Sequence, residues 1–317
     1  MRHLSIKNDF YLIFCKKSLF FVSKCLTLPC DKKYSLMKEI KFTKMHGIGN
    51  DYVYIDCMES EPEDIASLAV KMSDRHTGVG GDGIILICKS DVADFKMRMF
   101  NADGSEGKMC GNGSRCVGKY VYDYHLTDKT KITLETLSGI KIIDLHITDG
   151  KVTSATVDMG VPELSCPEIP VKWNAERLIS ETVTVDGKNY NLTAVSMGNP
   201  HGVVFVDSLD DIDVHGEGPK LETHPMWQDR ANIEFSEVLS PTEVRMRVWE
   251  RGSGETLACG TGACAIAVAG VLTGRTHRKV TIHLLGGDLE IFWNPDDSHV
   301  YMTGPATTVF DGVYYRD

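Results

Sequence analysis

The 317-residue sequence predicts an α+β protein that is built as two similar lobes. The main observation is a Cys-Gly-x-Gly motif that occurs twice, at Cys110 and at Cys259, and that opens a helix-like segment each time. The offset of 149 residues between these cysteines also relates other stretches of the chain. A repeat of this length indicates two lobes, because the repeats of a solenoid are much shorter.

The repeat extends well beyond the two cysteines. The same offset relates Lys-Met-Arg-Met-Phe at residues 96–100 to Arg-Met-Arg-Val-Trp at residues 245–249. It also relates Asn50 to Asn199, so each asparagine lies 60 residues before its cysteine. One fixed offset over so long a stretch indicates that both halves share one plan.

Composition and charge are those of a soluble globular protein. The hydrophobic content of 42% and the charged content of 25% are ordinary values. The formal net charge is −10, and residues 1–36 carry a net +5, so the remaining residues carry −15. This acidity argues against a nucleic-acid-binding surface.

The ten cysteines are scattered along the chain, which indicates a reduced, cytoplasmic protein. Zinc is an alternative for the pairs Cys110/Cys116 and Cys259/Cys264. Neither pair has the CxxC spacing that is typical of zinc ligands. We therefore expect no metal, and we expect Cys116 and Cys264 to be packing residues.

Residues 1–36 differ from the rest of the chain, since lysines interrupt their apolar runs. No uninterrupted run reaches the roughly 18–20 residues of a transmembrane helix, so we expect no membrane span. We expect an extended start assignment, with the working protein beginning at Met37. The alternative is a basic targeting or membrane-touching leader.

The first lobe is predicted to begin with a hairpin. Strands are expected at residues 40–45 and 52–57, and the turn between them is rich in residues that tolerate unusual backbone angles. Residues 62–75 are expected to form a helix with Pro62 near its start. The glycine-rich residues 78–83 then lead into a buried strand. They lack the Lys-Ser/Thr of a P-loop, so a tight turn near a ligand is expected rather than a phosphate site.

A polar loop is predicted to deliver the chain to the first motif. Residues 96–100 alternate as a strand, and residues 101–105 form the loop that leads to Cys110. The apolar residues after Cys110 are spaced as one face of a helix. Strands are expected within residues 131–147 and 151–159.

The second lobe is predicted to repeat this plan. Its helix from Cys259 to residue 272 is almost wholly small or apolar, which is typical of a helix buried on all sides. The strands and turns are expected at residues 182–185, 190–195, 198–202, 231–235, 243–249, 280–285, 288–293 and 299–303.

A cysteine at a helix start suits proton transfer. The helix N-terminus supplies a positive field and unpaired N–H groups, which favour thiolate and lower the thiol pKa. Cys110 and Cys259 both have this setting, which suggests two matched thiols. The N–H groups at Gly111-Asn112 and Gly260-Thr261 can hold a substrate carboxylate.

The motifs together resemble a known family. Asn-Ala-Asp-Gly-Ser at residues 101–105, followed by Cys-Gly-Asn-Gly-Ser-Arg at residues 110–115, resembles the signature of the diaminopimelate epimerases. Gly-Asn-Pro-His at residues 198–201, Trp-Glu-Arg-Gly at 249–252 and Ala-Cys-Gly-Thr-Gly at 258–262 are similar to the family's other motifs. The match covers essentially the whole chain after residue 36.

The resemblance implies a fold of two pseudo-symmetric lobes, each a mainly antiparallel sheet wrapped around a central helix. We expect the first lobe at residues 37–158 and the second at 159–304. The last strand, at about residues 306–316, is expected to return to the first lobe, which therefore includes residues 305–317. Residues 1–36 are expected to be an extension outside this fold.

The resemblance also implies the reaction and the site residues. It implies an isomerase of lysine and peptidoglycan precursor synthesis that converts LL- to meso-diaminopimelate between Cys110 and Cys259, without pyridoxal phosphate or another cofactor. His201 and Glu250 are implied to polarise or deprotonate the thiols; alone, these two would suggest a loop brace and a solvated strand end. The implied substrate-binding residues are Asn50, Asn101, Gly111, Asn112, Asn199, Asn232, Arg251, Gly260 and Thr261.

One departure from the family and two alternatives stay open. Some members place a glutamine at the position of Gly83, where this chain has no side-chain amide. A proline or hydroxyproline racemase of the same fold is one alternative, although Arg251 favours a substrate with a distal carboxylate. A redox switch that uses the two cysteines as a dithiol is the other. The resemblance implies a homodimer with a small-molecule substrate.

Overall fold

The computed structural model describes residues 38–316. The predictions about residues 1–36 and the start at Met37 therefore lie outside the described residues. Residues Ile40–Tyr314 form one compact unit. Residues 38–39 and 315–316 are the described part of a second unit.

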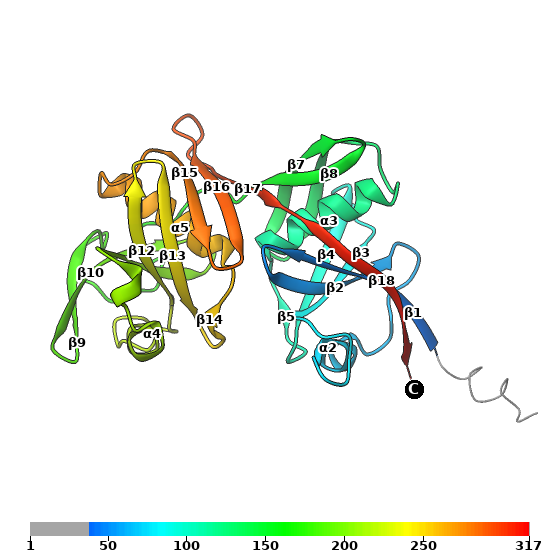
Figure 1. Cartoon of the computed structure of the whole chain (residues 1–317), viewed down its shortest axis with the longest axis horizontal. Helices are drawn as coiled ribbons and strands as arrows, with labels where there is room; N and C mark the ends of the chain where they lie inside the picture. Colours follow the sequence, from blue (N-terminus) through cyan, green and yellow to red (C-terminus); the bar gives the residue numbers. More distant parts are fainter. Residues whose placement is uncertain (1–37, 317) are drawn as a thin grey trace, which may run out of the picture. The chain divides into compact units, whose positions relative to one another are not determined.

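The elements follow the chain in two similar series (Figure 1). The first series is β1 (Lys38–Gly47), β2 (Asn50–Cys57), α2 (Ile65–Ser73), β3 (Gly83–Cys88), β4 (Phe95–Asn101), β5 (Glu106–Gly107), α3 (Gly111–Asp123), β6 (Lys131–Thr136), β7 (Gly139–Thr148) and β8 (Lys151–Asp158). The second is β9 (Glu181–Val185), β10 (Lys188–Ser196), β11 (Pro200–Val206), η1 (Leu209–Asp211), α4 (Val214–Glu222), β12 (Asn232–Ser240), β13 (Glu243–Glu250), β14 (Gly254–Thr256), α5 (Gly260–Leu272), β15 (Lys279–Leu284), β16 (Gly287–Trp293), β17 (Val300–Pro305) and β18 (Thr307–Arg316).

The offset of 149 residues holds for the helices as well as for the motifs. Moving α2 by 149 residues gives the bounds of α4, and moving α3 by the same offset gives those of α5. The helix α4 was not predicted, because Gly216, Gly218 and Pro219 hide its apolar spacing. The two-lobed α+β architecture predicted from the repeat is confirmed.

Strand pairing is mostly antiparallel, with the same exceptions in both series. β2 pairs with β3 in parallel and β4 with β6 in parallel, and the equivalent pairs β11–β12 and β13–β15 are also parallel. β17 pairs antiparallel with both β16 and β8, so hydrogen bonding runs from one series into the other. β18 pairs with β1, and Phe42 packs edge-on against Phe310 at 5.9 Å between ring centroids. The lobe boundaries given above remain a prediction.

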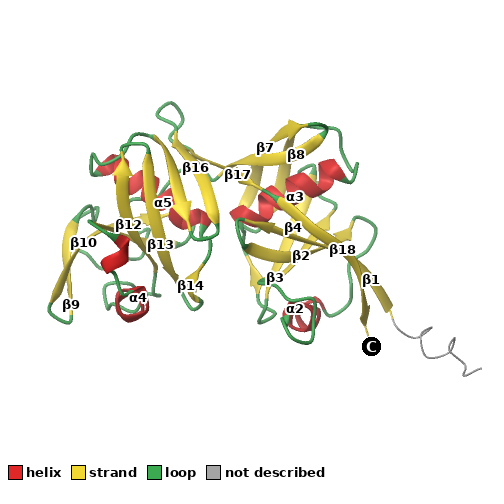
Figure 2. Ribbon diagram, in the orientation of Figure 1, coloured by secondary structure: helices red, strands yellow, loops and turns green. Residues whose placement is uncertain are grey.

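The helices α3 and α5 are each enclosed by strands of their own series (Figure 2). In α5, every residue from Gly262 to Gly270 is buried, as expected for a helix that is apolar on all sides. In α3, the residues from Gly111 to Gly118 are buried. Both helix starts therefore lie inside the protein, where their free N–H groups need partners.

The first helix is shorter than predicted. α2 begins at Ile65 rather than near Pro62, because Asp64 at its N-cap has a left-handed φ of 46°.

The glycine-rich loop after α2 is confirmed as a tight segment, with Gly78 N donating to Asp74 O and Gly81 N donating to Ser73 O, both at 3.0 Å.

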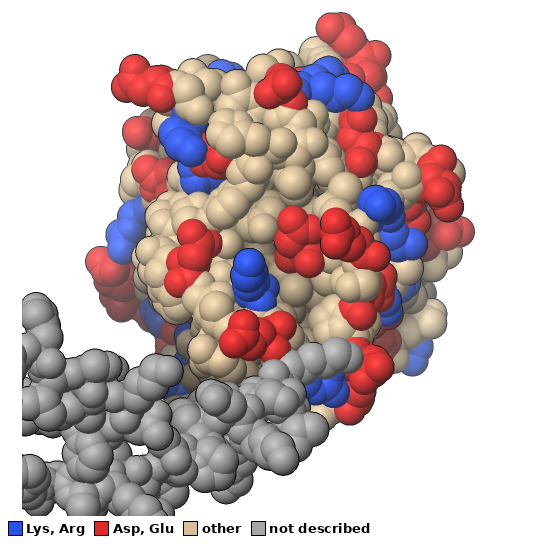
Figure 3. Space-filling model, turned by 90° about the vertical axis from the view of Figure 1, so that its right-hand side faces the viewer, with Lys and Arg blue, Asp and Glu red and all other residues tan. Residues whose placement is uncertain are grey.

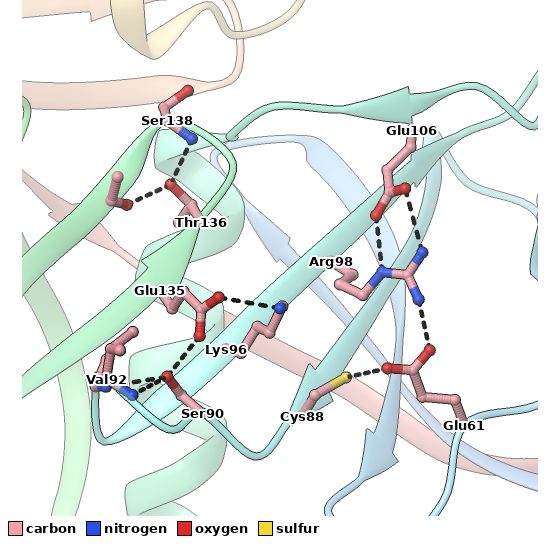
Figure 4. Close-up of polar contacts among 12 residues, drawn as sticks. Glu61, Cys88, Ser90, Val92, Lys96, Arg98, Glu106, Glu135, Thr136 and Ser138 are labelled. Carbon is pink, nitrogen blue, oxygen red and sulfur yellow. Dashed lines mark hydrogen bonds and ion pairs between the residues drawn. The ribbon is translucent and has the colours of Figure 1, made fainter.

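Charged side chains of both signs are interspersed on the face shown in Figure 3. Many of the charged groups of the first series form ion pairs, as on the outer side of β4 (Figure 4). There Arg98 Nε donates to Glu106 Oε1 at 2.8 Å and Arg98 Nη1 donates to Glu61 Oε2 at 2.5 Å. Among the described residues, no helix is both long enough and apolar enough to cross a membrane.

The burial of α5 predicts a modest stability cost for losing its second thiol. Cys264 is fully buried, and burial raises its pKa to about 12, so it is a neutral packing group. Cys264→Ala should lower the free energy of unfolding by about 1 kcal/mol, measured by urea denaturation. A loss above roughly 4 kcal/mol, the level that signals an exceptional mechanism, would contradict a simple packing role.

Candidate functional site

The first cysteine is the N-cap of α3. Cys110 has an extended backbone, and its Sγ accepts a hydrogen bond from Gly113 N at 3.3 Å. The same sulfur donates to Asn50 Oδ1 at 3.2 Å, and Asn112 Nδ2 donates to that oxygen at 3.4 Å. Asn50 and Cys110, which lie 60 residues apart in the sequence, are thus in direct contact in the fold.

A tight hairpin turn and the glycine-rich loop hold Asn50 in place. Gly47 pairs with Asn50, and the two residues between them have left-handed φ angles, 49° at Ile48 and 87° at Gly49. This is the geometry of a two-residue type I′ turn, and a β-branched residue is uncommon there. From the loop, Asp82 Oδ2 accepts from Asn50 Nδ2 at 2.7 Å. The loop therefore orients a site residue.

The second cysteine is the N-cap of α5 and lies among acids. Cys259 Sγ lies 3.5 Å from Thr261 Oγ1, and the Glu250 carboxylate is near enough to raise the pKa of the Cys259 thiol. Thr256 Oγ1 donates to Glu250 Oε1 and fixes the carboxylate. A Cβ added to Gly262 would lie 2.7 Å from Glu234 Oε1, so a second carboxylate lies against the start of α5.

His201 lies beside this acid and near the second thiol. Its Nδ1 lies 2.7 Å from Glu234 Oε1, and its Nε2 lies 3.1 Å from Asn199 Oδ1. Both His201 and Glu234 are fully buried, and Glu234 Oε2 has no hydrogen-bond partner among the described residues. A buried carboxylate with a free oxygen is costly, which is typical of a functional site.

Asn232 and Arg251 lie together at the end of this cluster. Arg251 N donates to Asn232 Oδ1 at 2.8 Å, and Asn232 Nδ2 donates to Pro200 O at 3.4 Å. Among the described residues the guanidinium contacts only Asp229, and only through Nη1, which donates to the backbone O at 2.8 Å and to Oδ2 at 3.1 Å. Since the Asp229 side chain is 84% exposed, this ion pair is weak.

The starts of α3 and α5 converge on one side chain. A Cβ added to Gly111 would lie 2.6 Å from Met302 Cε, and one added to Gly260 would lie 2.9 Å from Met302 Sδ. The Gly260 Cβ would also lie 3.5 Å from Asn112 Oδ1. Both Cys-Gly-x-Gly motifs therefore face one region, and the glycines allow this approach.

The prediction that the helix starts lower both thiol pKa values is wrong for this structure. Burial is the largest effect, and it raises the pKa of Cys110 to about 11, although Gly113 N–H and Arg115 act in the opposite direction. Burial also raises the pKa of Cys259 well above its usual value, and the Glu250 and Glu234 carboxylates raise it further. Burial likewise raises the pKa of Glu250.

One predicted site residue, Asn101, is placed differently from the rest, and Gly83 was not among the predicted site residues. Asn101 Nδ2 donates to Ser105 Oγ at 3.0 Å, within its own polar loop, and no contact joins it to the other predicted site residues among those described. At Gly83, an added Cβ would collide with Phe100 O and would lie 2.9 Å from Tyr52 Cε1. Local packing therefore requires a glycine at this position.

Sequence reasoning missed two acids that hold the site. Glu234 orients His201, and its signal was a lone acid among the buried residues of β12. Asp82 orients Asn50, and its signal was an acid between the glycines of the loop.

The donor atoms of His201, Glu234 and Cys259 lie within 4.8 Å of one another, a spacing that could also hold a metal ion.

Comparison with known sequences gives consistent matches. A sequence model described as diaminopimelate epimerase matches residues 42–165 and 193–309. The diaminopimelate epimerase of Acetivibrio thermocellus is 55% identical over 273 residues, which is 86% of this chain and 98% of the relative. That of Phocaeicola vulgatus is 57% identical over 274 residues, covering 86% and 97%. The family resemblance stated from the motifs is confirmed.

Solved structures of low identity share the fold. A PhzF-family phenazine biosynthesis protein of Bacillus anthracis has a TM-score of 0.64 at 18% identity, covering 88% of this chain and 99% of that one. A hydroxyproline epimerase of Agrobacterium vitis has a TM-score of 0.62 at 15% identity, covering 88% and 92%. At these identities the likeness shows the fold alone.

The raised pKa of Cys110 predicts an unusual pH profile for its alkylation. Only the thiolate reacts, so the rate constant should rise roughly tenfold per pH unit between pH 7 and pH 10. A free thiol would level off above about pH 8.5. Iodoacetamide labelling of substrate-free protein, followed by peptide mapping, measures this rate. A plateau below pH 9 would show that the helix start outweighs burial.

Proposed function

Since the chain belongs to the diaminopimelate epimerase family, we propose that it interconverts LL- and meso-diaminopimelate by inverting one α-carbon. The observation that carries this proposal is the pair of N-capping cysteines, Cys110 and Cys259, at two helix starts that meet at Met302. The reaction requires one proton-transfer group on each face of the substrate, and two repeated helix starts supply them.

In the proposed reaction, one cysteine acts as thiolate and the other as thiol. The thiolate takes the α-proton and becomes a thiol, while the electron pair of the C–H bond stays on the α-carbon. The opposite thiol then gives its proton to the other face and becomes the thiolate. Net charge and proton number are unchanged, and the reverse reaction uses the same groups in exchanged roles. No step in this scheme calls for a pyridoxal cofactor.

Neighbouring groups are proposed to manage the protons and the developing charge. Glu250, whose charge acts on Cys259, would take the proton of that thiol, and the His201–Glu234 pair adjoins the same helix start. The N–H groups at the two helix starts would hold the substrate α-carboxylate and stabilise the carbanion. Asn50 and Asn112 would orient the substrate from the first series, and Asn199 and Thr261 from the second.

Incubation with LL-diaminopimelate in deuterated water tests the reaction and its mechanism. Wild-type protein should place deuterium at the α-carbon, because each thiol exchanges its proton with solvent between turnovers. Cys110→Ala and Cys259→Ala should each lower epimerisation by at least 1000-fold, since each removes one of the two proton-transfer groups. A correctly folded variant that keeps most of its activity would refute the two-thiol mechanism.

The same assay separates the alternatives. Turnover of proline or hydroxyproline instead of diaminopimelate would identify a racemase of the other substrate class. A dithiol redox switch would give no deuterium in any substrate. The fold likeness to a hydroxyproline epimerase does not favour the first alternative, because it shows fold only.

Arg251 is proposed to bind the distal carboxylate of the substrate. Its guanidinium has one weak partner, Asp229, and a planar fork can bind a carboxylate through two hydrogen bonds. Arg251→Lys keeps the charge but loses the fork, so we expect kcat/KM to fall at least tenfold. The control is Arg98→Lys, since Arg98 lies in the ion-pair cluster of Figure 4. Equal losses in both variants would remove Arg251 from the site.

The homodimer is also proposed, together with a cytoplasmic location. Apolar side chains of β18 support self-association, because Val309, Phe310 and Val313 are 53%, 46% and 42% exposed. Light scattering of the purified protein measures the mass in solution, and a mass of one chain would contradict the dimer.

A further inference from the structure

Arg115 is a buried cation that the proposed reaction does not yet use. It lies on α3, five residues after Cys110, and none of its surface is exposed. Its guanidinium donates from three nitrogens to three uncharged acceptors: Nη2 to Asn112 Oδ1 at 2.8 Å, Nε to Pro305 O at 3.1 Å, and Nη1 to Met302 Sδ at 3.7 Å.

No carboxylate forms an ion pair with Arg115 among the described residues. The ionisable groups near it include three thiols and one phenol, Cys110, Cys116, Cys264 and Tyr54. A guanidinium remains protonated at neutral pH, and burial of a charge without an opposite charge is costly. The positive charge therefore has a reason to be retained other than stability.

The surroundings are shaped to admit this guanidinium. A Cβ added to Gly47 would lie 2.9 Å from Arg115 Nη2, and one added to Gly304 would lie 3.1 Å from Nε. Two glycines from strands at opposite ends of the chain thus leave the room that the planar group occupies. Neither glycine has a left-handed φ, so the need for space, rather than the backbone angle, explains why glycine stands at these two positions.

Arg115 is connected to the first thiol by a short chain of contacts. Its Nη2 donates a hydrogen bond to Asn112 Oδ1, and this leaves the Asn112 amide nitrogen directed toward Asn50 Oδ1. That oxygen is also the acceptor of Cys110 Sγ. In the second series the position equivalent to Arg115 is Cys264, so only the first helix carries a cation.

We propose that Arg115 is a positioning residue of the first thiol: its guanidinium fixes the Asn112 amide and supplies an uncompensated positive charge that favours the thiolate form of Cys110. This inference rests on the proposed function for its catalytic meaning, but its effect on Cys110 exists without substrate. The other ionisable groups that act on Cys110 are Cys116 and Glu250, and the buried Tyr52 phenol also lies close to it.

The test is the alkylation rate of Cys110 in substrate-free protein at pH 8.5, measured by peptide mapping after iodoacetamide. Arg115→Met should lower this rate at least threefold, because the thiolate fraction falls when the positive charge is removed. Arg115→Lys should restore the rate to within twofold of wild type, yet it should raise KM for diaminopimelate at least fivefold because Asn112 is no longer held. Arg98→Met, which removes a surface guanidinium, should leave the Cys110 rate unchanged.

Two results would overturn the proposal. One is a folded Arg115→Met variant that labels Cys110 at the wild-type rate. The other comes from Gly47→Ala, which decides the question if Arg115→Met does not fold. The added Cβ would press on Arg115 Nη2 and on Asn112 while the positive charge remains. A folded Gly47→Ala variant with wild-type KM would refute the positioning role, and a raised KM would support it. Because labelling needs no substrate, a failure of the proposed epimerase reaction would leave this result interpretable.

Discussion

Cys110 and Cys259 each occupy the N-cap position of a buried helix, and this constraint shapes most of the site. A buried helix start has N–H groups that need acceptors, and Cys110 Sγ serves as one for Gly113 N. The next residue must be small, because a Cβ at Gly111 or Gly260 would meet Met302. The Cys-Gly order thus places a thiol, free N–H groups and a close approach of two helices at one point.

The two series share their scaffold contacts and differ in their site contacts. Arg98 pairs with Glu106 on the outer side of β4, and Arg247 pairs with Glu255 at the equivalent place on β13, with Nε–Oε1 distances of 2.8 and 2.7 Å. Around the thiols the equivalences break down. The position of His201 is Tyr52 in the first series, that of Glu234 is Ile85, and that of Cys264 is Arg115. The two series are therefore alike where residues pair strands, and they differ around the two cysteines.

The sequence predicted what repeats and what is periodic. The offset of 149 residues gave both thiols, the Asn50–Asn199 relation and the two buried helices, and the structure has α3 and α5 at equivalent positions. The same offset applied to the first helix would also have found α4, whose glycines and proline concealed it. Periodicity did not reveal the short start of α2, because that depends on the left-handed backbone at Asp64.

Residues that act through others were harder to predict. Glu234 and Asp82 have no motif of their own, and their roles depend on contacts with His201 and Asn50 that only folding creates. The prediction that both thiol pKa values are lowered failed for a related reason. A helix start is visible in a sequence, whereas the extent of burial that outweighs it depends on how strands and helices pack around Cys110.

The unequal surroundings of the two thiols have a consequence for a reversible reaction. In a resting pair of one thiolate and one thiol, two identical sites would share the single thiol proton equally. For either substrate, half of the molecules would then carry the thiolate on the face where the acid is needed. Here Arg115 lowers the pKa of Cys110 against the larger effect of burial, whereas burial and the Glu250 and Glu234 carboxylates all raise the pKa of Cys259. In the proposed mechanism the second thiol therefore needs help to become a thiolate. In that mechanism Glu250, whose charge raises the pKa of Cys259, would take the proton. Burial raises the pKa of Cys110 as well, so the fixed positive charge of Arg115 is proposed to offset part of that effect at the first thiol.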